Sequence, residues 1–118
     1  MKTIAVDFDG VVHKYSHGYL DGSIYDESVD GALEALKELM ADYAVFIFTA
    51  RDTISVAAWL TERGFRTVLT SPTAPLWDMQ GILLVTQTKY VADAYIDDRG
   101  IRFEDWDQVM ADVKRLMT

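Results

Sequence analysis

The chain has 118 residues, a formal net charge of −8 and a sequence that is half hydrophobic. This length suits one domain over residues 1–118, and the negative charge argues against bulk binding to nucleic-acid backbone or anionic membranes. The absence of cysteine excludes disulfides and thiolate metal sites, and with only two histidines a zinc site is not expected. Acids interrupt the apolar N-terminal run and no stretch is long enough to span a membrane, which favours a cytoplasmic protein.

The apolar run from Thr3 to Val6 leads into Asp7-Phe8-Asp9-Gly10, which predicts a buried strand ending in a turn. Carboxylates at i and i+2 of an extended chain point the same way. Two such charges about 4 Å apart repel by roughly 4 kcal/mol at an effective dielectric of 20. A divalent cation with oxygen ligands would offset this repulsion, and the simpler alternative is that the pair only caps the turn.

The polar, aromatic stretch from His13 to Glu27 is predicted to be a long loop, either a flap over a substrate or a surface hairpin around Asp21-Gly22. Its histidines and tyrosines are candidates for contacts with a base or sugar. A first helix is expected to begin at Ser28 as N-cap. Its predicted core stripe is Val29, Leu33, Leu36 and Met40.

The continuous apolar run 44–48 predicts a central parallel strand, followed by Thr49-Ala50-Arg51-Asp52. The next helix is expected over about 54–63, capped by Asp52 or Thr53 and ended by Gly64. A third strand is expected at 67–69.

The segment 71–81 contains two prolines and is predicted to be irregular, with Trp77 and Met79 either covering the site or filling the edge of the core. A short strand is expected at 82–85, and Lys89 follows in a turn. Apolar residues then run into Asp97-Asp98, as at the first strand end. The last helix, about 104–116, is expected to bury a stripe of Trp106, Val109, Met110, Val113, Leu116 and Met117.

Alternation of strands and helices predicts an α/β domain, with a mostly parallel sheet, right-handed crossovers and helices on both faces. Ligands of such sheets bind outside the carboxyl ends of the strands. The polar residues at predicted strand ends should therefore converge there, and they are Asp7, Asp9, Thr49, Asp97 and Asp98, with Lys89 nearby. Carboxylates around one cation, with a hydroxyl and a lysine, suit phosphate chemistry with aspartate as nucleophile.

The residues in these four positions resemble the motifs of the haloacid dehalogenase-like (HAD) phosphohydrolase superfamily. The similar residues are Asp7-Phe8-Asp9-Gly10-Val11-Val12, the strand ending at Thr49, Lys89, and Tyr95-Ile96-Asp97-Asp98-Arg99. The resemblance implies a three-layer Rossmann-like fold, with Asp7 as nucleophile and Asp9 as general acid and base. Thr49 and Lys89 would hold the phosphoryl group, bordered by Gly10, Ala50 and Arg51.

The resemblance also implies Mg²⁺, bound by the Asp7 carboxylate, the Asp9 main-chain carbonyl and Asp97. Asp98 would orient a metal-bound water or Lys89. Neither 13–27 nor 71–87 is long enough to form a cap domain, so the chain resembles capless, minimal members. Such members act on large phosphorylated substrates or borrow a second subunit as a lid. A phosphorylated small molecule or an oligonucleotide end is therefore the expected partner, and the sequence does not name the substrate.

Two other classes compete with a hydrolase. A response-regulator receiver domain has this length and uses similar residues, but it carries its phospho-acceptor at the middle strand, where this chain has Thr49. A catalytically idle phosphate-binding module is the third reading, although every expected motif residue is present. A calcium loop beginning at Asp7 is excluded, because Val11 and Val12 stand where it needs a ligand and a glycine.

Overall fold

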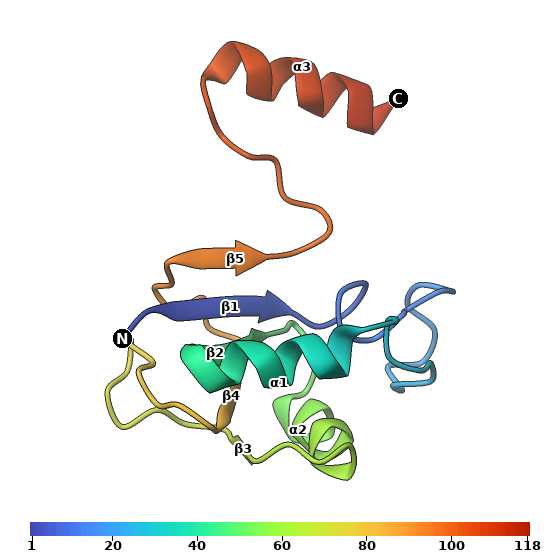
Figure 1. Cartoon of the computed structure of the whole chain (residues 1–118). Helices are drawn as coiled ribbons and strands as arrows, with labels where there is room; N and C mark the ends of the chain where they lie inside the picture. Colours follow the sequence, from blue (N-terminus) through green and yellow to red (C-terminus); the bar gives the residue numbers. More distant parts are fainter.

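Strands and helices alternate around one sheet in the computed structural model, which describes all residues from 1 to 118 (Figure 1). The elements are β1 Thr3–Asp7, α1 Ala32–Asp42, β2 Ala44–Phe48, α2 Thr53–Glu62, β3 Thr67–Val68, β4 Leu83–Thr86, β5 Ala94–Ile96 and α3 Trp106–Met117. The strand order is β3-β4-β2-β1-β5, and every neighbouring pair is parallel. The predicted α/β class with a Rossmann-like parallel sheet is thus confirmed. No helix is both long and apolar enough to cross a membrane.

Helices α1 and α2 cover the same face of the sheet. Alternate residues of the strands point to opposite faces, so Val45 and Ile47 of β2 meet the helices while Phe46 points away. The helices contribute Leu36 and Met40 from α1 and Val56, Ala57, Trp59 and Leu60 from α2. This larger core holds β1 and β2 rigidly side by side and so positions the loops at their carboxyl ends.

The opposite face is covered by coil rather than by helix. Trp77 is buried there against Phe46, and its Nε1–H donates to the Val45 carbonyl at 2.9 Å. Tyr90 packs on the same face. Of the two roles considered for Trp77, filling the core is the one observed, while Met79 stays partly exposed.

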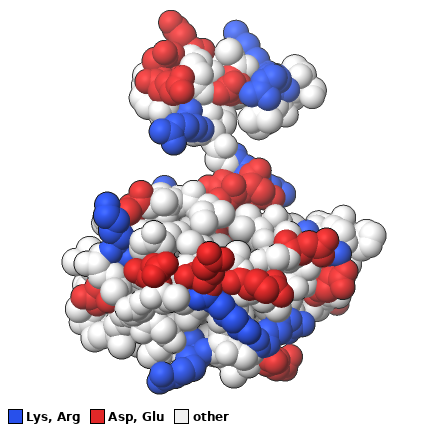
Figure 2. Space-filling view, viewed as in Figure 1, with Lys and Arg blue, Asp and Glu red and all other residues white.

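The last helix is the largest departure from prediction. Helix α3 packs against no other element, and none of its residues is buried, so the predicted buried stripe from Trp106 to Met117 is wrong. The extended segment 97–105 carries α3 away from the sheet (Figure 1), and Figure 2 shows it as a separate lobe on a narrow neck. Helical periodicity predicts that a helix has an apolar face, but it says nothing of what covers that face. The predicted helices on both faces and three-layer packing are therefore not observed.

Helix starts depend on local capping, which was predicted correctly for α2 and wrongly for α1. Asp52 is the N-cap of α2, and its carboxylate accepts from the main-chain N–H groups of Ile54 and Ser55. Helix α1 begins only after Gly31, whose φ is 81°, and not at Ser28. The reason is that Val29 N–H donates to the Val12 carbonyl at 2.8 Å, which ties this segment to the first turn.

Candidate functional site

The strand register brings three predicted site segments to one edge of the sheet. Asp7, the last residue of β1, pairs with Phe48 of β2, so Thr49 follows at the carboxyl edge. Val6 pairs with Ile96 of β5, so Asp97 comes one residue further, at the level of Asp7. The predicted convergence of these strand ends is therefore observed.

A groove of about 260 Å³ opens beside Asp7, over the paired strands β1 and β5 and the end of β2. Its lining combines an apolar floor with acidic and basic groups, namely Ala5, Asp7, Phe48, Tyr95, Ile96, Asp97, Arg99 and Gly100. The groove exists because the face of the sheet near β5 carries no helix, and all three residues of β5 are exposed.

Asp7 is half-buried in this groove and has no cationic partner. Its Oδ1 accepts one hydrogen bond, from the main-chain N–H of Phe8 at 2.9 Å. Burial raises the pKa of the Asp7 carboxyl, and the charges of Asp98, Asp97 and Asp9 raise it further, while the Phe8 N–H opposes them. No basic side chain forms an ion pair with Asp7, although Arg99 lines the same groove.

Asp98 and Asp97 lie against two glycines. A β-carbon on Gly10 would stand 2.2 Å from Asp98 Oδ2, and Gly10 has a φ of 84°, so no other residue fits there without a shift. Asp97 Oδ1 accepts from the main-chain N–H groups of Arg99 and Gly100, which fixes its own turn. Gly10 therefore permits the loop after β5 to approach the loop after β1.

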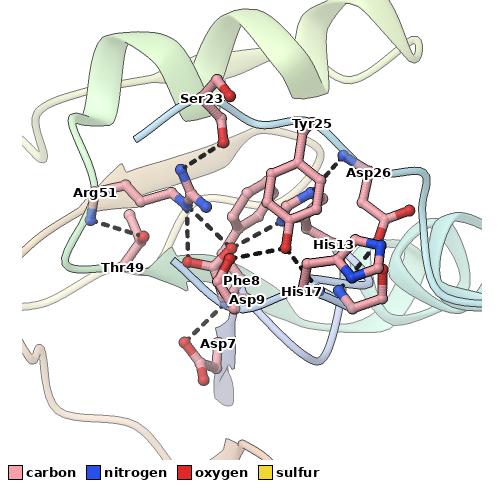
Figure 3. A network of polar contacts seen from close by, with 12 residues as sticks. Asp7, Phe8, Asp9, His13, His17, Ser23, Tyr25, Asp26, Thr49 and Arg51 are labelled. Carbon is pink, nitrogen blue, oxygen red and sulfur yellow. Dashed lines mark hydrogen bonds and ion pairs between the residues drawn. The ribbon is translucent and has the colours of Figure 1, made fainter. Parts of the chain in front are cut away.

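Asp9 has the opposite environment from Asp7. Arg51 Nε donates to both carboxylate oxygens of Asp9, at 3.0 Å to Oδ1 and 2.8 Å to Oδ2 (Figure 3). His13 Nδ1 lies 2.9 Å from Asp9 Oδ1. The Asp9 side chain is thus held from two directions, and its main-chain carbonyl is the atom expected to bind the metal.

Arg51 connects the strand-end loops to the long loop 13–27. Its main-chain N–H donates to the buried Thr49 hydroxyl at 3.1 Å, and its Nη1 donates to the carbonyls of Gly22 and Ser23 (Figure 3). Its guanidinium also lies 5.4 Å from the Tyr15 ring centroid, a cation–π contact. Arg51 therefore links Asp9, Thr49 and loop 13–27, and it places a positive charge beside the Asp9 carboxylate.

Loop 13–27 is internally bonded and forms no hairpin strands. Asp26 accepts from the Ser16 hydroxyl and main-chain N–H and from the Glu27 N–H, which lowers the pKa of Asp26 to about 2. Tyr15 has a φ of 55°, a strained value for a residue with a side chain. A second cavity of about 420 Å³ opens under this loop, lined by Asp9, Tyr15, Tyr19, Gly22, Ala50, Arg51 and Asp52. The loop therefore borders the site, as a flap would.

Lys89 is the predicted site residue that stands apart. It is exposed, forms no ion pair with any carboxylate, and lies 4.9 Å from the ring centroid of Tyr95. Tyr95 lines the groove with Asp7, so the ammonium lies beside the groove rather than between the acids. The expected contact between Lys89 and Asp98 is not present.

The donor chemistry of this edge fits a hard cation such as Mg²⁺. No three His, Cys, Asp or Glu side chains converge on a common metal position anywhere in the chain. The expected set needs no such cluster, because Mg²⁺ is usually bound by one or two carboxylates together with waters and substrate phosphates. The acids that raise the pKa of Asp7 also indicate a negative potential that a cation would relieve.

Two residues with structural roles at the site were not predicted. The sequence suggested His13 as a candidate for contact with a base or sugar. In the structure His13 is instead fully buried against Asp9 and is not free to make such a contact. Gln87 donates from Nε2 to the Arg51 carbonyl at 2.9 Å and so fixes the loop after β2. Only one feature of the sequence could have indicated the contact between His13 and Asp9. The two residues are four apart, across a turn that contains Gly10.

Comparison of the chain with protein-family models, with curated proteins and with solved structures gives no match, so the interpretation of this site depends on its own residues and geometry.

Proposed function

We propose that this protein is a magnesium-dependent phosphomonoester hydrolase of the HAD-like type, which works through an aspartyl-phosphate on Asp7. The observation that carries the proposal is the contrast between the two acids at the end of β1. Asp7 is open to a groove and unpaired with any cation, whereas Asp9 is held by Arg51 and His13. A nucleophile must be free to approach phosphorus, and a general acid and base must be held in a fixed position.

In the first step Asp7 attacks the phosphorus of the ester. Oδ1 accepts the Phe8 N–H and Oδ2 accepts no hydrogen bond, so we assign the new P–O bond to the less constrained Oδ2. The bond from phosphorus to the leaving oxygen breaks, and that oxygen takes a proton from Asp9. The products of this step are the free alcohol and the phosphorylated Asp7.

In the second step a water attacks the same phosphorus and gives its proton to the Asp9 carboxylate. The bond between phosphorus and Asp7 breaks, which releases inorganic phosphate and restores the Asp7 carboxylate. The Thr49 hydroxyl accepts from the Arg51 N–H, so its own hydrogen is available to a phosphoryl oxygen. Lys89, whose ammonium lies 4.9 Å from the ring centroid of the groove residue Tyr95, would supply a positive charge to the phosphate.

A magnesium ion held by the Asp7 carboxylate, the Asp9 carbonyl and Asp97 would neutralise the facing charges of enzyme and substrate. Bound there, it would also favour the ionised form of Asp7, opposing the effect of burial and of the neighbouring acids.

The sheet order disfavours the receiver-domain alternative. Receiver domains have the doubly wound order 2-1-3-4-5, in which the first strand lies between the second and third. Here β1 lies between β2 and β5, and the central strand β2 ends at Thr49 rather than at an acid. The acid available for phosphorylation is on β1, as the hydrolase proposal requires.

The groove beside Asp7 is open to solvent, and this openness favours one class of substrate over another. An open site excludes water poorly, so small esters should be hydrolysed slowly and with little selectivity. A bulky phosphorylated substrate, such as an oligonucleotide end, covers the mouth itself. We therefore propose phosphorylated compounds of this kind as better substrates than small metabolites.

The test is phosphate release from p-nitrophenyl phosphate, a nucleoside monophosphate and a phosphorylated oligonucleotide, each with Mg²⁺ and with excess EDTA. We expect activity that requires the metal and that is greatest on the oligonucleotide. Full activity in EDTA would contradict the metal-dependent mechanism. Fast and selective hydrolysis of one small ester by a monomer would contradict the substrate argument alone.

A further inference from the structure

His13 is a buried polar residue that contacts Asp9 and exchanges no proton in the two steps above. Its side chain has no exposed surface, and both ring nitrogens are paired. Nε2 accepts from the main-chain N–H of Asp26 at 3.0 Å. Because a main-chain N–H can only donate, Nε2 carries no proton, so the ring is neutral and its proton is on Nδ1. That N–H donates to Asp9 Oδ1 at 2.9 Å.

The direction of this hydrogen bond is set by the packing of the ring. Phe8 stacks on His13 with centroids 5.5 Å apart and an interplanar angle of 17°. Trp59 and Tyr25 contact the ring edge-on, at 6.1 Å and 5.3 Å between centroids. Tyr15 lies tilted against it at 6.0 Å, so four aromatic neighbours fix the plane of the imidazole, and the Asp26 N–H fixes its tautomer.

His13 completes a two-point attachment of Asp9. Arg51 reaches both oxygens of Asp9 through the single N–H on Nε, and one donor alone permits the carboxylate to rotate about it. His13 adds a donor from a second direction, to Oδ1 only. Oδ1 then receives two donors and Oδ2 receives one, so a lone pair stays free on Oδ2.

We infer that His13 is a positioning residue, which holds Asp9 so that Oδ2 is the oxygen that exchanges a proton with the leaving group. This inference rests on the proposed hydrolase function. In the step concerned, the proton on Oδ2 passes to the leaving oxygen as the P–O bond breaks, and Asp9 becomes a carboxylate. A misplaced Asp9 slows the attack of water on phosphorylated Asp7 for every ester, but it slows the first step only for esters whose leaving group needs that proton.

Two substitutions separate the hydrogen bond to Asp9 from the rest of the ring. In His13→Asn the amide nitrogen stands near the position of Nδ1 and can still donate to Asp9. In His13→Gln the amide reaches the position of Nε2, where it can accept from the Asp26 N–H, and no donor faces Asp9. Both variants lose the aromatic ring, so the loss of packing is matched between them. Thermal melts should show similar destabilisation of the two.

The substrates are p-nitrophenyl phosphate and p-nitrobenzyl phosphate, which differ by one methylene. The nitrophenolate leaves without protonation, whereas the benzylic alkoxide must be protonated as it leaves. For His13→Gln we expect kcat/KM, which reports the step that forms phosphorylated Asp7, to fall by about 100-fold for the benzyl ester and by less than about 5-fold for the phenyl ester. For His13→Asn we expect most of the benzyl ester activity to remain. Equal losses on both esters, or equal losses in both variants, would overturn the inference.

A second arm uses Asp9→Asn as the background. If His13 acts through Asp9, adding His13→Gln to Asp9→Asn should cause no further selective loss on the benzyl ester. A full additional selective loss would show that His13 acts by another route. This arm compares the two esters in the same protein, so a loss of stability that lowers both activities equally does not affect the result.

The inference can fail separately from the proposed function. A wild-type protein that hydrolyses neither ester would contradict the function, and the placement of His13 is then judged by ¹⁵N NMR of the imidazole. We expect the pattern of a neutral ring protonated on Nδ1. A ring protonated on Nε2 could not donate to Asp9, and that result would overturn the inference whatever the activity.

Discussion

Asp7 and Asp9 are two residues apart at the end of one strand, yet their carboxylates have opposite neighbours. Asp7 faces a groove and other acids, and burial and these charges raise its pKa. Asp9 faces a guanidinium and an imidazole N–H, in a cavity beneath loop 13–27. The same side-chain chemistry is thus kept free in one position and constrained in the other. The difference comes from residues outside the Asp7-Phe8-Asp9 motif: Arg51 lies 42 residues from Asp9 in the sequence, and His13 lies four.

The largest expected effect separates the two acids by substitution. Asp7→Asn should lower turnover by at least about 10⁴-fold and abolish any phosphoenzyme, because the nucleophile is gone. Asp9→Asn should lower turnover by about 10²-fold while preserving binding of metal and of a phosphate mimic. The measurements are steady-state kinetics and acid-quench trapping of labelled phosphate. Trapped phosphate in the Asp7 variant would show that the two roles are assigned wrongly.

The next largest effect is the stabilisation by Mg²⁺ that we expect from the negative potential around Asp7. A metal that binds only the folded state adds about 2.7 kcal/mol to the free energy of unfolding at 100 times its dissociation constant. We expect Mg²⁺ to raise the melting temperature of the wild type clearly, and to do so much less in Asp97→Ala. The matched control is Asp107→Ala, which removes one acid from α3, remote from the sheet. If Mg²⁺ raises the melting temperature equally in wild type and Asp97→Ala, Asp97 is not a ligand.

On the Asp9 side, Arg51→Lys tests the connection to the long loop. Lysine keeps the charge but cannot reach both Asp9 and the carbonyls of Gly22 and Ser23. We expect kcat/KM to fall about tenfold, equivalent to about 1.4 kcal/mol. Hydrogen exchange of the loop tip should also become faster. Arg66→Lys is the control for the same change at an exposed arginine, and tip exchange that is unchanged in Arg51→Lys would remove the proposed link.

The smallest effect is the dependence of stability on pH without metal. The pKa of Asp7 in the folded protein is above the unfolded value of 3.8, so the folded state keeps a proton that the unfolded chain loses. The contribution of Asp7 to the free energy of unfolding therefore falls as pH rises from 3.8 through the folded pKa. Asp7→Asn lacks this loss, so in EDTA at neutral pH it should be more stable than the wild type. Urea titrations at several pH values check this, and an advantage that persists below pH 3.8 would have another cause.

The part of the site predicted from sequence is the part that depends on strand ends. Parallel strands present their carboxyl ends at one edge, so Asp7, Thr49 and Asp97 could be placed together from their positions after apolar runs. The cap of α2 at Asp52 followed from local hydrogen bonding alone. These predictions succeeded because periodicity and capping are properties of short segments.

What could not be predicted depends on contacts between segments. The role of His13 is set by Asp26 and by four aromatic rings, and the sequence pattern around His13 does not identify these contacts. The start of α1 moved because Val29 bonds to Val12, and the apolar face of α3 stays uncovered although its pattern is that of a core helix. Capping and periodicity describe a segment, and both predictions failed where another segment decided the outcome.

The separation of α3 from the sheet also gives the tryptophans of the chain two different fluorescence environments. Trp59 and Trp77 are 6% and 1% exposed, whereas Trp106, the first residue of α3, is 69% exposed. Buried indoles emit at shorter wavelength than hydrated ones and are protected from aqueous quenchers. Acrylamide or iodide should therefore quench Trp106 selectively and leave a blue-shifted emission from the body, which Trp106→Phe would isolate. Intrinsic fluorescence can thus follow the surroundings of the last helix and the unfolding of the sheet as separate signals from one sample.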